Sequence, residues 1–414
     1  MPAPVRAEIP RAEIPRAEIA RADLVRAAQE LAPEISAQAD EIERAGRLPD
    51  TIADRFAAAG LYSLYLPANG GGPECDPISA MTAIEVLARA DASAGWCAHV
   101  SSANAWALAT LHPDTLAAMS TAAEGRWSMS GSARPLGRAR PVPGGYQVSG
   151  RWDFASNCLH ASWYSGTCVV EQANGKVRNR TLIMPITDGT IIDTWQVTGM
   201  RGTGSHDFEV TDVFVPDERV GIGRNLAHQQ GPLYRPRLTM VVTWALTAAV
   251  ALGNARGALD TFRELANQTT AERTEVPLRD RGEVQQAVGR AEAMISAARS
   301  YCYHGVADAW HAMSLPDASD TANPADPADP ANPAELDRLV LDARLSIPHA
   351  MHTAVAAIDL LFSAGGTRSI YHRNHLERRF RDAHTALRHV AGSTQHFIAG
   401  GRLSLGVPVG APFW

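Results

Sequence analysis

The stretch VPGGYQVSGRWDFASN, from Val142 to Asn157, carries the clearest local signal in the chain. Its Pro-Gly-Gly step is a turn sequence, and the alternating residues that follow it are typical of the second strand of a hairpin. The surrounding segment, Trp127–Val215, is dense in Gly, Thr, Val and Ser. It therefore predicts a compact β-domain, with further strands at Thr167–Val170, Thr181–Ile186, Thr190–Val197 and Phe208–Val215.

Helical patterns lie on both sides of this β-domain. Before it, apolar residues recur at helical spacing from about Ala20 to Ala59, and Pro33 and Pro49 are expected to break this stretch into separate helices. Two more helices are expected at Pro77–Leu87 and Ala94–Thr110. After the β-domain, four long helices are predicted: Met240–Leu265, one through Val284–Cys302, Leu336–Phe362 with a kink at Pro348, and His375–Ala399.

This order predicts an α+β fold that is mostly α. We expect a low-complexity extension over residues 1–20, which repeats the motif P-R-A-E-I, then a helical domain over 21–125. A β-domain over 126–232 and a helical domain over 233–406 follow, the latter with a Pro/Asp/Ala loop at 316–335. Strands confined to the middle third argue against a Rossmann sheet, and no G-x-G-x-x-G motif opens a helix after a strand.

Composition excludes several classes of function. The net charge of −6 argues against a nucleic-acid binder. Five cysteines without a C-x-x-C pair do not form a disulfide framework and suit a reducing cytoplasm. The most apolar stretch, Thr239–Leu252, is too short to span a bilayer, so no membrane association is expected. His349 with His352 and His372 with His375 have helical spacing, but no completing motif, so no metal is predicted.

Four patches of the sequence resemble the acyl-CoA dehydrogenase superfamily. Within it, the chain resembles the reduced-flavin-dependent (group D) monooxygenases of two-component systems. The resemblance implies an N-terminal helical domain, a central β-barrel or β-sandwich and a C-terminal four-helix bundle. The patches are Gly144–Asn157, Trp195–Ser205 with Val213–Pro216, Arg273–Arg299, and Gly365-Gly366 with Arg381–His384 and His389.

The resemblance also implies which residues hold a flavin. Phe154 would lie beside the isoalloxazine, and Ser156 would reach the N5 edge, where a hydroxyl suits a nitrogen whose protonation changes with redox state. Ser130, Gly131 and Ser132 would face the pyrimidine side and the phosphates. Arg273 would reach a neighbouring subunit's flavin pyrophosphate, and Gly365-Gly366 would lie near the adenine. FAD, as FADH2, is the expected cofactor, with FMN possible.

Each of these positions also has a purely structural interpretation. Ser156 could be a strand-end serine that bonds its own backbone, and Arg273 could be a surface arginine. Gly365-Gly366 could end a helix, and Thr203-Gly204-Ser205 could be a plain turn. Glu275-Val276 departs from the dehydrogenase pattern, which expects an aromatic residue and a glycine there.

The position of the catalytic base separates a dehydrogenase from an oxygenase. Dehydrogenation needs a carboxylate to remove the α-proton. In the commonest dehydrogenase pattern, the glutamate position falls within His389–Gly392. No glutamate lies between Arg381 and Trp414, and Leu252-Gly253-Asn254 offers no carboxylate either. A histidine suits an oxygenase that forms a flavin C4a-hydroperoxide. His389 and Ser156 are therefore the predicted catalytic residues, with His384 as the alternative histidine.

Trp96 and His99 lie at helical spacing in the segment expected to face the substrate, together with Trp106. They could belong to the helical core. If they line the pocket instead, they favour a flat aromatic substrate of phenolic or indole type over a CoA thioester, and this substrate would be hydroxylated with O2. The absence of a nicotinamide motif agrees with a separate flavin reductase, and the resemblance implies a homotetramer or homodimer. The alternatives are an N-oxygenase of an amine, an acyl-CoA dehydrogenase with a non-standard base, and a non-enzymatic scaffold.

Overall fold

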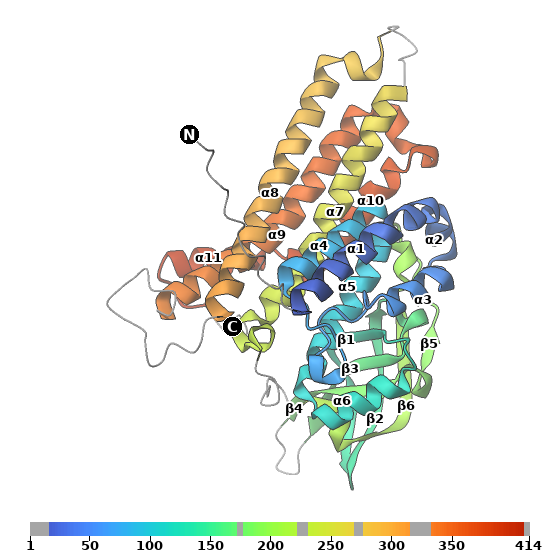
Figure 1. Ribbon diagram of the computed structural model, residues 1–414, viewed down its shortest axis with the longest axis vertical. Helices are drawn as coiled ribbons and strands as arrows, with labels where there is room; N and C mark the ends of the chain where they lie inside the picture. The colour runs from blue at the N-terminus through green and yellow to red at the C-terminus, as the bar shows by residue number, and fades with distance from the viewer. Residues whose placement is uncertain (1–15, 172–176, 222–230, 269–275, 315–332, 410–414) are drawn as a thin grey trace, which may run out of the picture.

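The computed structural model describes residues 16–171, 177–221, 231–268, 276–314 and 333–409. Most of the N-terminal extension predicted over residues 1–20 and most of the loop predicted over 316–335 lie outside these ranges. The described chain forms helices, then a sheet, then helices again (Figure 1). This order confirms the predicted α+β, mostly α fold.

Most of the N-terminal helices lie above the sheet, whereas α6 lies beside its strands (Figure 1). The prediction that Pro33 breaks the first helix is wrong, because α1 continues through it to Ala37. Leu31 and Ile35, on either side of the proline, are fully buried, so packing holds the helix despite one lost backbone bond. The helices are α1 (Arg16–Ala37), α2 (Ala39–Ala45), α3 (Asp50–Ala58), α4 (Pro77–Ala90), α5 (Ala92–Ala107) and α6 (Pro113–Ala122).

Two aspartates fix where α4 and α5 begin. The Asp76 carboxylate accepts hydrogen bonds from the backbone N–H groups of Ile78 and Ser79, at 3.0 and 2.9 Å. Asp91 likewise accepts from the N–H of Ala94 at 3.0 Å. These caps satisfy amide groups that a helix N-terminus leaves unpaired. They fix the start of α5, the helix that carries Trp96 and His99.

The predicted β-domain is a single seven-stranded mixed sheet with the order β5-β6-β2-β1-β3-β4-β7. The predicted hairpin is confirmed, since Val142 pairs with Gly145 across a turn in which Gly144 has a φ of +79°. Among the strand pairs of the described residues, only β1 and β3 run parallel. The strands are β1 (Met129–Val142), β2 (Gly145–Ala155), β3 (Trp163–Glu171), β4 (Val177–Pro185), β5 (Thr190–Ile192), β6 (His206–Pro216) and β7 (Val220–Gly221).

Trp152 is the centre of the β-domain core and is completely buried. Glycines make room for its indole ring, since a Cβ at Gly166 would lie 2.9 Å from Trp152 Cζ2 and one at Gly150 would lie 3.0 Å from Cη2. Tyr164 and Phe208 complete this core, with ring centroids 4.2 Å apart. The large apolar area buried here anchors β2, at whose end Ser156 lies.

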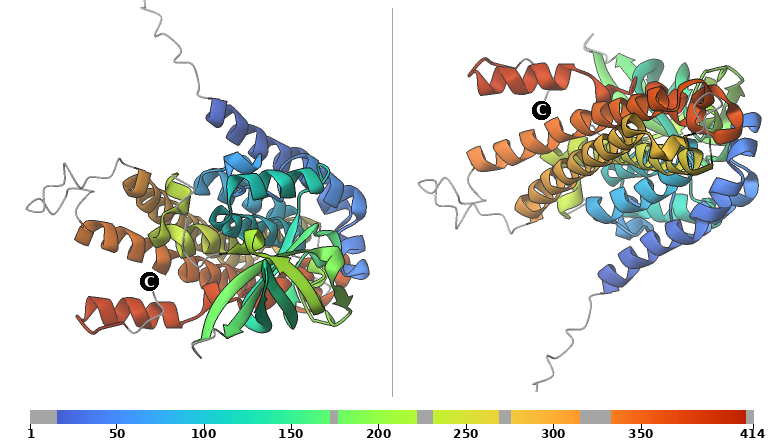
Figure 2. Two further views of the ribbon diagram at one scale, coloured as in Figure 1. Left: turned by 90° about the horizontal axis from the view of Figure 1, so that it is seen from below. Right: turned by 90° about the horizontal axis from the view of Figure 1, so that it is seen from above.

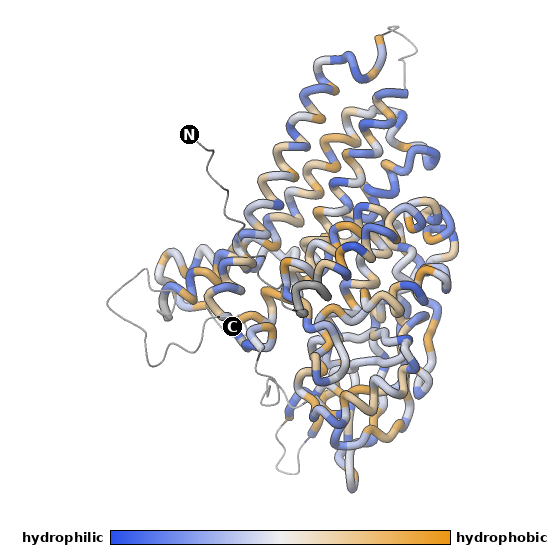
Figure 3. The backbone as a smooth tube through the Cα atoms, viewed as in Figure 1, coloured by the Kyte–Doolittle hydropathy of each residue, from blue (hydrophilic) through white to orange (hydrophobic). Residues whose placement is uncertain are grey.

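The C-terminal helices pack side by side in a bundle, with α7 between α4 and α9 (Figures 1 and 2). Hydrophobic and hydrophilic residues alternate along them, as expected for helices with one buried face (Figure 3). The helix α9 continues through Pro348. The helices are α7 (Thr239–Gln268), α8 (Gly282–Ser314), α9 (Pro333–Ala364), α10 (Leu376–Ala386) and α11 (Gln395–Ser404).

The prediction of one helix over His375–Ala399 is wrong, because α10 ends at Ala386 and α11 begins at Gln395. Between them, His389 has extended backbone angles and begins a short 3-10 helix, Val390–Gly392. The close approach of this segment requires a glycine, since a Cβ at Gly392 would lie 2.7 Å from the carbonyl oxygen of Leu387. The break takes His389 off the helix and orients it toward α5.

One helix among the described residues, Glu335–Ala364, is long and apolar enough to cross a membrane by length and composition. More than half of its most apolar window, 56%, is buried inside the protein. It packs most extensively against α8 and also against α7. Its apolar surface therefore belongs to the core of the bundle.

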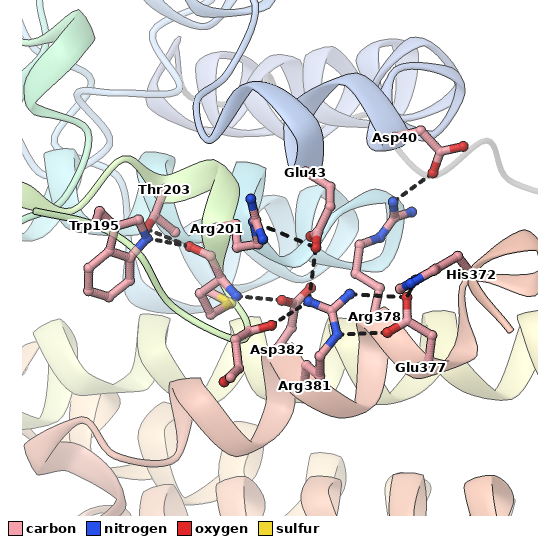
Figure 4. A network of polar contacts seen from close by, with 12 residues as sticks. Asp40, Glu43, Trp195, Arg201, Thr203, His372, Glu377, Arg378, Arg381 and Asp382 are labelled. Carbon is pink, nitrogen blue, oxygen red and sulfur yellow. Dashed lines mark hydrogen bonds and ion pairs between the residues drawn. The ribbon is translucent and has the colours of Figure 1, made fainter. Parts of the chain in front are cut away.

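A polar network joins α10 to the loop before β6 and to α2 (Figure 4). The Asp382 carboxylate accepts a hydrogen bond from the backbone N–H of Met200. Arg381 donates to Glu377 at 2.7 Å, to Glu43 at 2.9 Å and to the carbonyl oxygen of Thr198. Burial, together with the charge of Asp91, raises the pKa of Asp382 to about 7. This network therefore holds together α2, the loop before β6 and α10, which are distant in sequence.

A Gly199→Ala variant is expected to lower the free energy of unfolding by about 1–3 kcal/mol, the usual cost of overpacking. The added methyl group would overlap the Arg381 carbonyl group and lie 2.8 Å from the Asp382 nitrogen, so the loop would have to move away from α10. Thermal unfolding measures the effect. The matched control is Gly289→Ala on the exposed face of α8, where nothing lies within 4 Å. The control should keep or raise the free energy of unfolding. An equal fall in both variants would contradict the close contact between Gly199 and α10 as the cause.

Candidate active site

The structure brings together four of the residues predicted to form the site. Trp96 and His99 come from α5, Ser156 from the end of β2, and His389 from the break after α10. The ring centroid of Trp96 lies 5.2 Å from that of His99 and 5.5 Å from that of His389, both edge to face. The Trp96 indole Nε1 donates a hydrogen bond to Ser156 Oγ at 3.1 Å. The cluster therefore spans all three parts of the fold.

Ser156 is buried, and its hydroxyl is the first of three hydroxyls that lie in a hydrogen-bonded row. Ser156 Oγ lies 2.7 Å from Ser205 Oγ, which lies 2.6 Å from Thr203 Oγ1. Thr203 Oγ1 donates to the carbonyl oxygen of Met200 at 2.8 Å. Ser156 is thus more than a strand-end serine that bonds its own backbone. From the sequence alone, Thr203-Gly204-Ser205 is interpreted only as a turn. No local pattern links the hydroxyls of Thr203 and Ser205 to Ser156.

His389 is held in one orientation and in its neutral form. Its Nδ1 accepts a hydrogen bond from the backbone N–H of Ala391 at 3.2 Å, so the neutral ring carries its proton on Nε2. Burial lowers the pKa of His389 to about 4. At neutral pH the ring is therefore a hydrogen-bond donor through Nε2.

His99 is almost completely buried beside His389. Its Nε2 lies 3.1 Å from Thr247 Oγ1 on α7, and its Nδ1 is buried without a hydrogen-bond partner among the described residues. Burial, together with the neighbouring His389, lowers the pKa of His99 to about 3. A second neutral imidazole thus lies next to the first. Thr247 was not singled out from the sequence, since a threonine in a buried helix has no distinguishing signal.

His384, the alternative histidine, lies elsewhere. Its Nε2 is 2.8 Å from the Asp359 carboxylate, and its ring packs against Phe380 at 4.4 Å. It makes a hydrogen bond between α10 and α9 and is absent from the cluster. The geometry therefore favours His389 as the histidine of the site.

Two of the residues predicted to contact a flavin, Phe154 and Ser130, have surroundings that fit such a group. Phe154 has a φ of +58°, is 58% exposed, and meets Trp195 edge to face at 6.0 Å. An exposed aromatic side chain at a strained backbone position is an appropriate neighbour for a flat ring. Ser130 Oγ is buried without a partner among the described residues, so it is available to a ligand.

Gly131 lies where β1 approaches β3, and a Cβ there would overlap Ser165 Oγ. Ser132 Oγ accepts from the N–H of Arg134 at 3.4 Å. Gly365 follows the end of α9, and Gly366 has a φ of +56°, so this pair ends the helix as the structural interpretation expected. Flavin contacts for these residues remain predictions. Arg273 lies outside the described residues.

The paired histidines considered for a metal have other contacts. The His349 ring packs against Tyr301, and His352 Nε2 lies 2.9 Å from the carbonyl oxygen of Gly392. Within the described part of the chain, no group of three or more His, Cys, Asp or Glu could hold a metal ion. A groove of about 710 Å³ beside α1 and Trp127 shares no residue with the cluster.

Comparison with known proteins places this fold and site in a class. Residues 20–112 match the family model of the acyl-CoA dehydrogenase N-terminal domain, and residues 245–394 match that of the C-terminal domain. The chain belongs to the acyl-CoA dehydrogenase family. Its relatives lie in the branch of flavin-dependent monooxygenase oxygenase subunits.

Three relatives and one solved structure illustrate the branch. The flavin-dependent monooxygenase oxygenase subunit HsaA of Rhodococcus jostii is 28% identical, over 92% of this chain and 97% of its own. The pigment production hydroxylase of Rhodococcus erythropolis is 30% identical, over 90% and 94%. The FADH(2)-dependent resorcinol hydroxylase oxygenase component of a Rhizobium species is 31% identical, over 55% and 57%. The crystal structure of 3-HSA hydroxylase from a Rhodococcus species superposes with a TM-score of 0.81 at 26% identity, covering 94% and 98%.

Proposed function

We propose that this chain is the oxygenase component of a two-component flavin-dependent monooxygenase that hydroxylates an aromatic small molecule of phenolic or indole type. In the overall reaction, one oxygen atom of O2 enters a C–H bond of the substrate and the other leaves as water. Bound reduced flavin supplies the two electrons and two protons that this reaction needs. The relatives named for resorcinol hydroxylation and as flavin-dependent monooxygenase subunits support this assignment.

The observation that carries the proposal is the place of His389. The segment where a dehydrogenase carries its carboxylate, His389–Gly392, holds no carboxylate and begins with a neutral imidazole, whose ring contacts Trp96, which bonds Ser156. Because burial lowers its pKa to about 4, this ring is a weak base, but it can donate a hydrogen bond to a reacting oxygen through Nε2. His389 is therefore assigned to the reacting oxygen, and Ser156 to the N5 edge of the flavin.

Trp96 and His99 are assigned to the substrate. Their rings, with that of His389, stand edge to face and form a wall that matches an aromatic ring. Phe154 and Ser130 are assigned to the flavin, together with Gly131, Ser132, Arg273, Gly365 and Gly366. FAD is the proposed flavin, with FMN as the alternative. We further propose a separate flavin reductase as partner, a cytoplasmic location and a homotetramer or homodimer.

Isotope labelling tests the reaction. The protein is supplied with FAD, a flavin reductase, NADH, oxygen-18 gas and a panel of phenols and indoles, and products are analysed by mass spectrometry. One product should carry a single oxygen-18 atom, and its formation should require the reductase or chemically reduced FAD. An amine product bearing the label would establish the N-oxygenase instead. Bleaching of tightly bound FAD by an acyl-CoA, without labelled product, would establish a dehydrogenase.

A further inference from the structure

The hydrogen bonds around Ser156 form a chain with only one possible direction. One end is Trp96, whose indole N–H can donate but cannot accept. The other end is the Met200 carbonyl oxygen, which can accept but cannot donate. Three hydroxyls lie between them, on Ser156, Ser205 and Thr203. Each hydroxyl has one proton to give, so the two ends fix the direction of every bond.

The direction follows one hydroxyl at a time. Thr203 gives its proton to the Met200 carbonyl oxygen, so the bond between Thr203 and Ser205 must use the proton of Ser205. The bond between Ser205 and Ser156 must then use the proton of Ser156. Ser156 also accepts from Trp96, which leaves its oxygen one free lone pair and no free proton.

We propose that this chain, through Thr203 and Ser205 as positioning residues, makes Ser156 an obligatory hydrogen-bond acceptor and so selects reduced over oxidised flavin. The proposal rests on the proposed function. Reduced flavin carries a hydrogen on N5 and can donate to Ser156. Oxidised flavin has a bare N5 lone pair, so a favourable bond to it would require Ser156 to donate and the chain to break.

The surroundings hold the chain in this arrangement. Ser156, Ser205 and Thr203 are all buried, so water does not compete for their bonds. The Met200 carbonyl oxygen also accepts a hydrogen bond from the Trp195 indole Nε1 at 2.9 Å, and the Met200 N–H donates one to the Asp382 carboxylate. Figure 4 shows Trp195, Thr203 and Asp382 converging on this loop. The acceptor end of the chain is therefore fixed from two sides.

A Thr203→Val variant tests the proposal, because valine keeps the shape of threonine but cannot accept from Ser205. The Ser205 proton is then free to turn toward Ser156, and Ser156 can donate outward. We expect the ratio of the dissociation constants for oxidised and reduced FAD to fall about fivefold, the factor that one neutral hydrogen bond contributes. The midpoint potential of bound FAD should fall correspondingly by about 20 mV, at 29.6 mV per tenfold change for two electrons.

Both quantities are measured on the full chain, by anaerobic titration with FAD and dithionite-reduced FAD and by dye equilibration. Thr203→Ser keeps the hydroxyl and should restore the wild-type ratio. Thr167→Val is the matched control, since it removes a buried threonine hydroxyl of the same sheet domain that lies outside the chain. It should leave the ratio unchanged.

The outcomes separate this inference from the function on which it rests. If the wild-type protein binds neither form of FAD, the proposed function fails. If it binds FAD and Thr203→Val leaves both the ratio and the potential at wild-type values, the inference is wrong while the function stands. If Thr203→Val binds neither form, Ser205→Ala decides: the same fall in ratio supports the inference, and an unchanged ratio overturns it.

Discussion

A His389→Ala variant is expected to hydroxylate the substrate about 100- to 10,000-fold more slowly than the wild-type protein, the range that a positioned acid–base group contributes. Alanine removes the His389 ring with its Nε2 donor, but it leaves the residues of the Ser156 chain in place. Binding of reduced FAD should therefore change little. Single-turnover product formation, with FAD binding measured in parallel, checks both expectations.

The matched control is His384→Ala, five residues earlier, which removes a hydrogen bond to Asp359. It should retain hydroxylation to within a few-fold. Equal losses in both variants would contradict the assignment of His389, and a loss in His384→Ala alone would transfer the role to His384.

The pH dependence offers a second check on His389. Burial lowers its pKa to about 4, below the ordinary value of 6.5, so the ring stays neutral from neutral pH down to about that value. If the neutral ring is the active form, the loss of hydroxylation that depends on His389 occurs as the pH falls through about 4. A fall in the hydroxylation rate near pH 6.5 that disappears in His389→Ala would contradict the buried environment of His389.

The second large effect is expected from Arg379→Met, which should lower the free energy of unfolding by several kcal/mol, since each buried carbonyl left without a partner costs about 1–3 kcal/mol. Arg379 is buried and its guanidinium donates to the carbonyl oxygens of Ala88, Arg89 and Ala90, at 3.1, 2.7 and 2.8 Å. These are the last carbonyls of α4, which have no partner within their own helix. Methionine fills a similar volume but leaves them unpaired.

Thermal unfolding, followed by circular dichroism, measures this effect. Arg388→Met is the control, because Arg388 is exposed and donates only a 3.3 Å bond to the His384 carbonyl oxygen among the interactions described. It should change the unfolding midpoint by less than a degree or two, since isolated surface contacts contribute little. A small effect at Arg379 would mean that the α4 terminus is satisfied in another way.

Local patterns were enough to predict the hairpin at Val142–Gly145 and the order of helices and strands. They failed where distant contacts decide the backbone. Pro33 stays helical because Leu31 and Ile35 are buried beside it, and the break before α11 depends on the fit of Gly392 against Leu387. Neither effect has a signature in the surrounding residues.

The candidate site, like the fold, was predictable only in part from the sequence. Ser156, His389, Trp96 and His99 were singled out from a resemblance and are brought together by the fold. The bonds that direct Ser156 were not predicted, because their partners lie 60 and 49 residues away in sequence. A serine and a threonine in a glycine turn are common, so only the three-dimensional arrangement distinguishes these.

The segment from Asp382 to His389 has a consequence for how such proteins diversify. Its first residue holds the Met200 loop, which ends the chain from Ser156, and its last residue is the histidine itself. Ser156 and His389, the proposed catalytic residues, are thus held in register by one short length of backbone, whereas His99 and Thr247 come from α5 and α7. Trp96 also lies on α5, but it belongs with the proposed catalytic residues because its indole donates to Ser156. A mutational library aimed at new substrates should therefore vary α5 and α7 apart from Trp96, and leave residues 382–389 untouched.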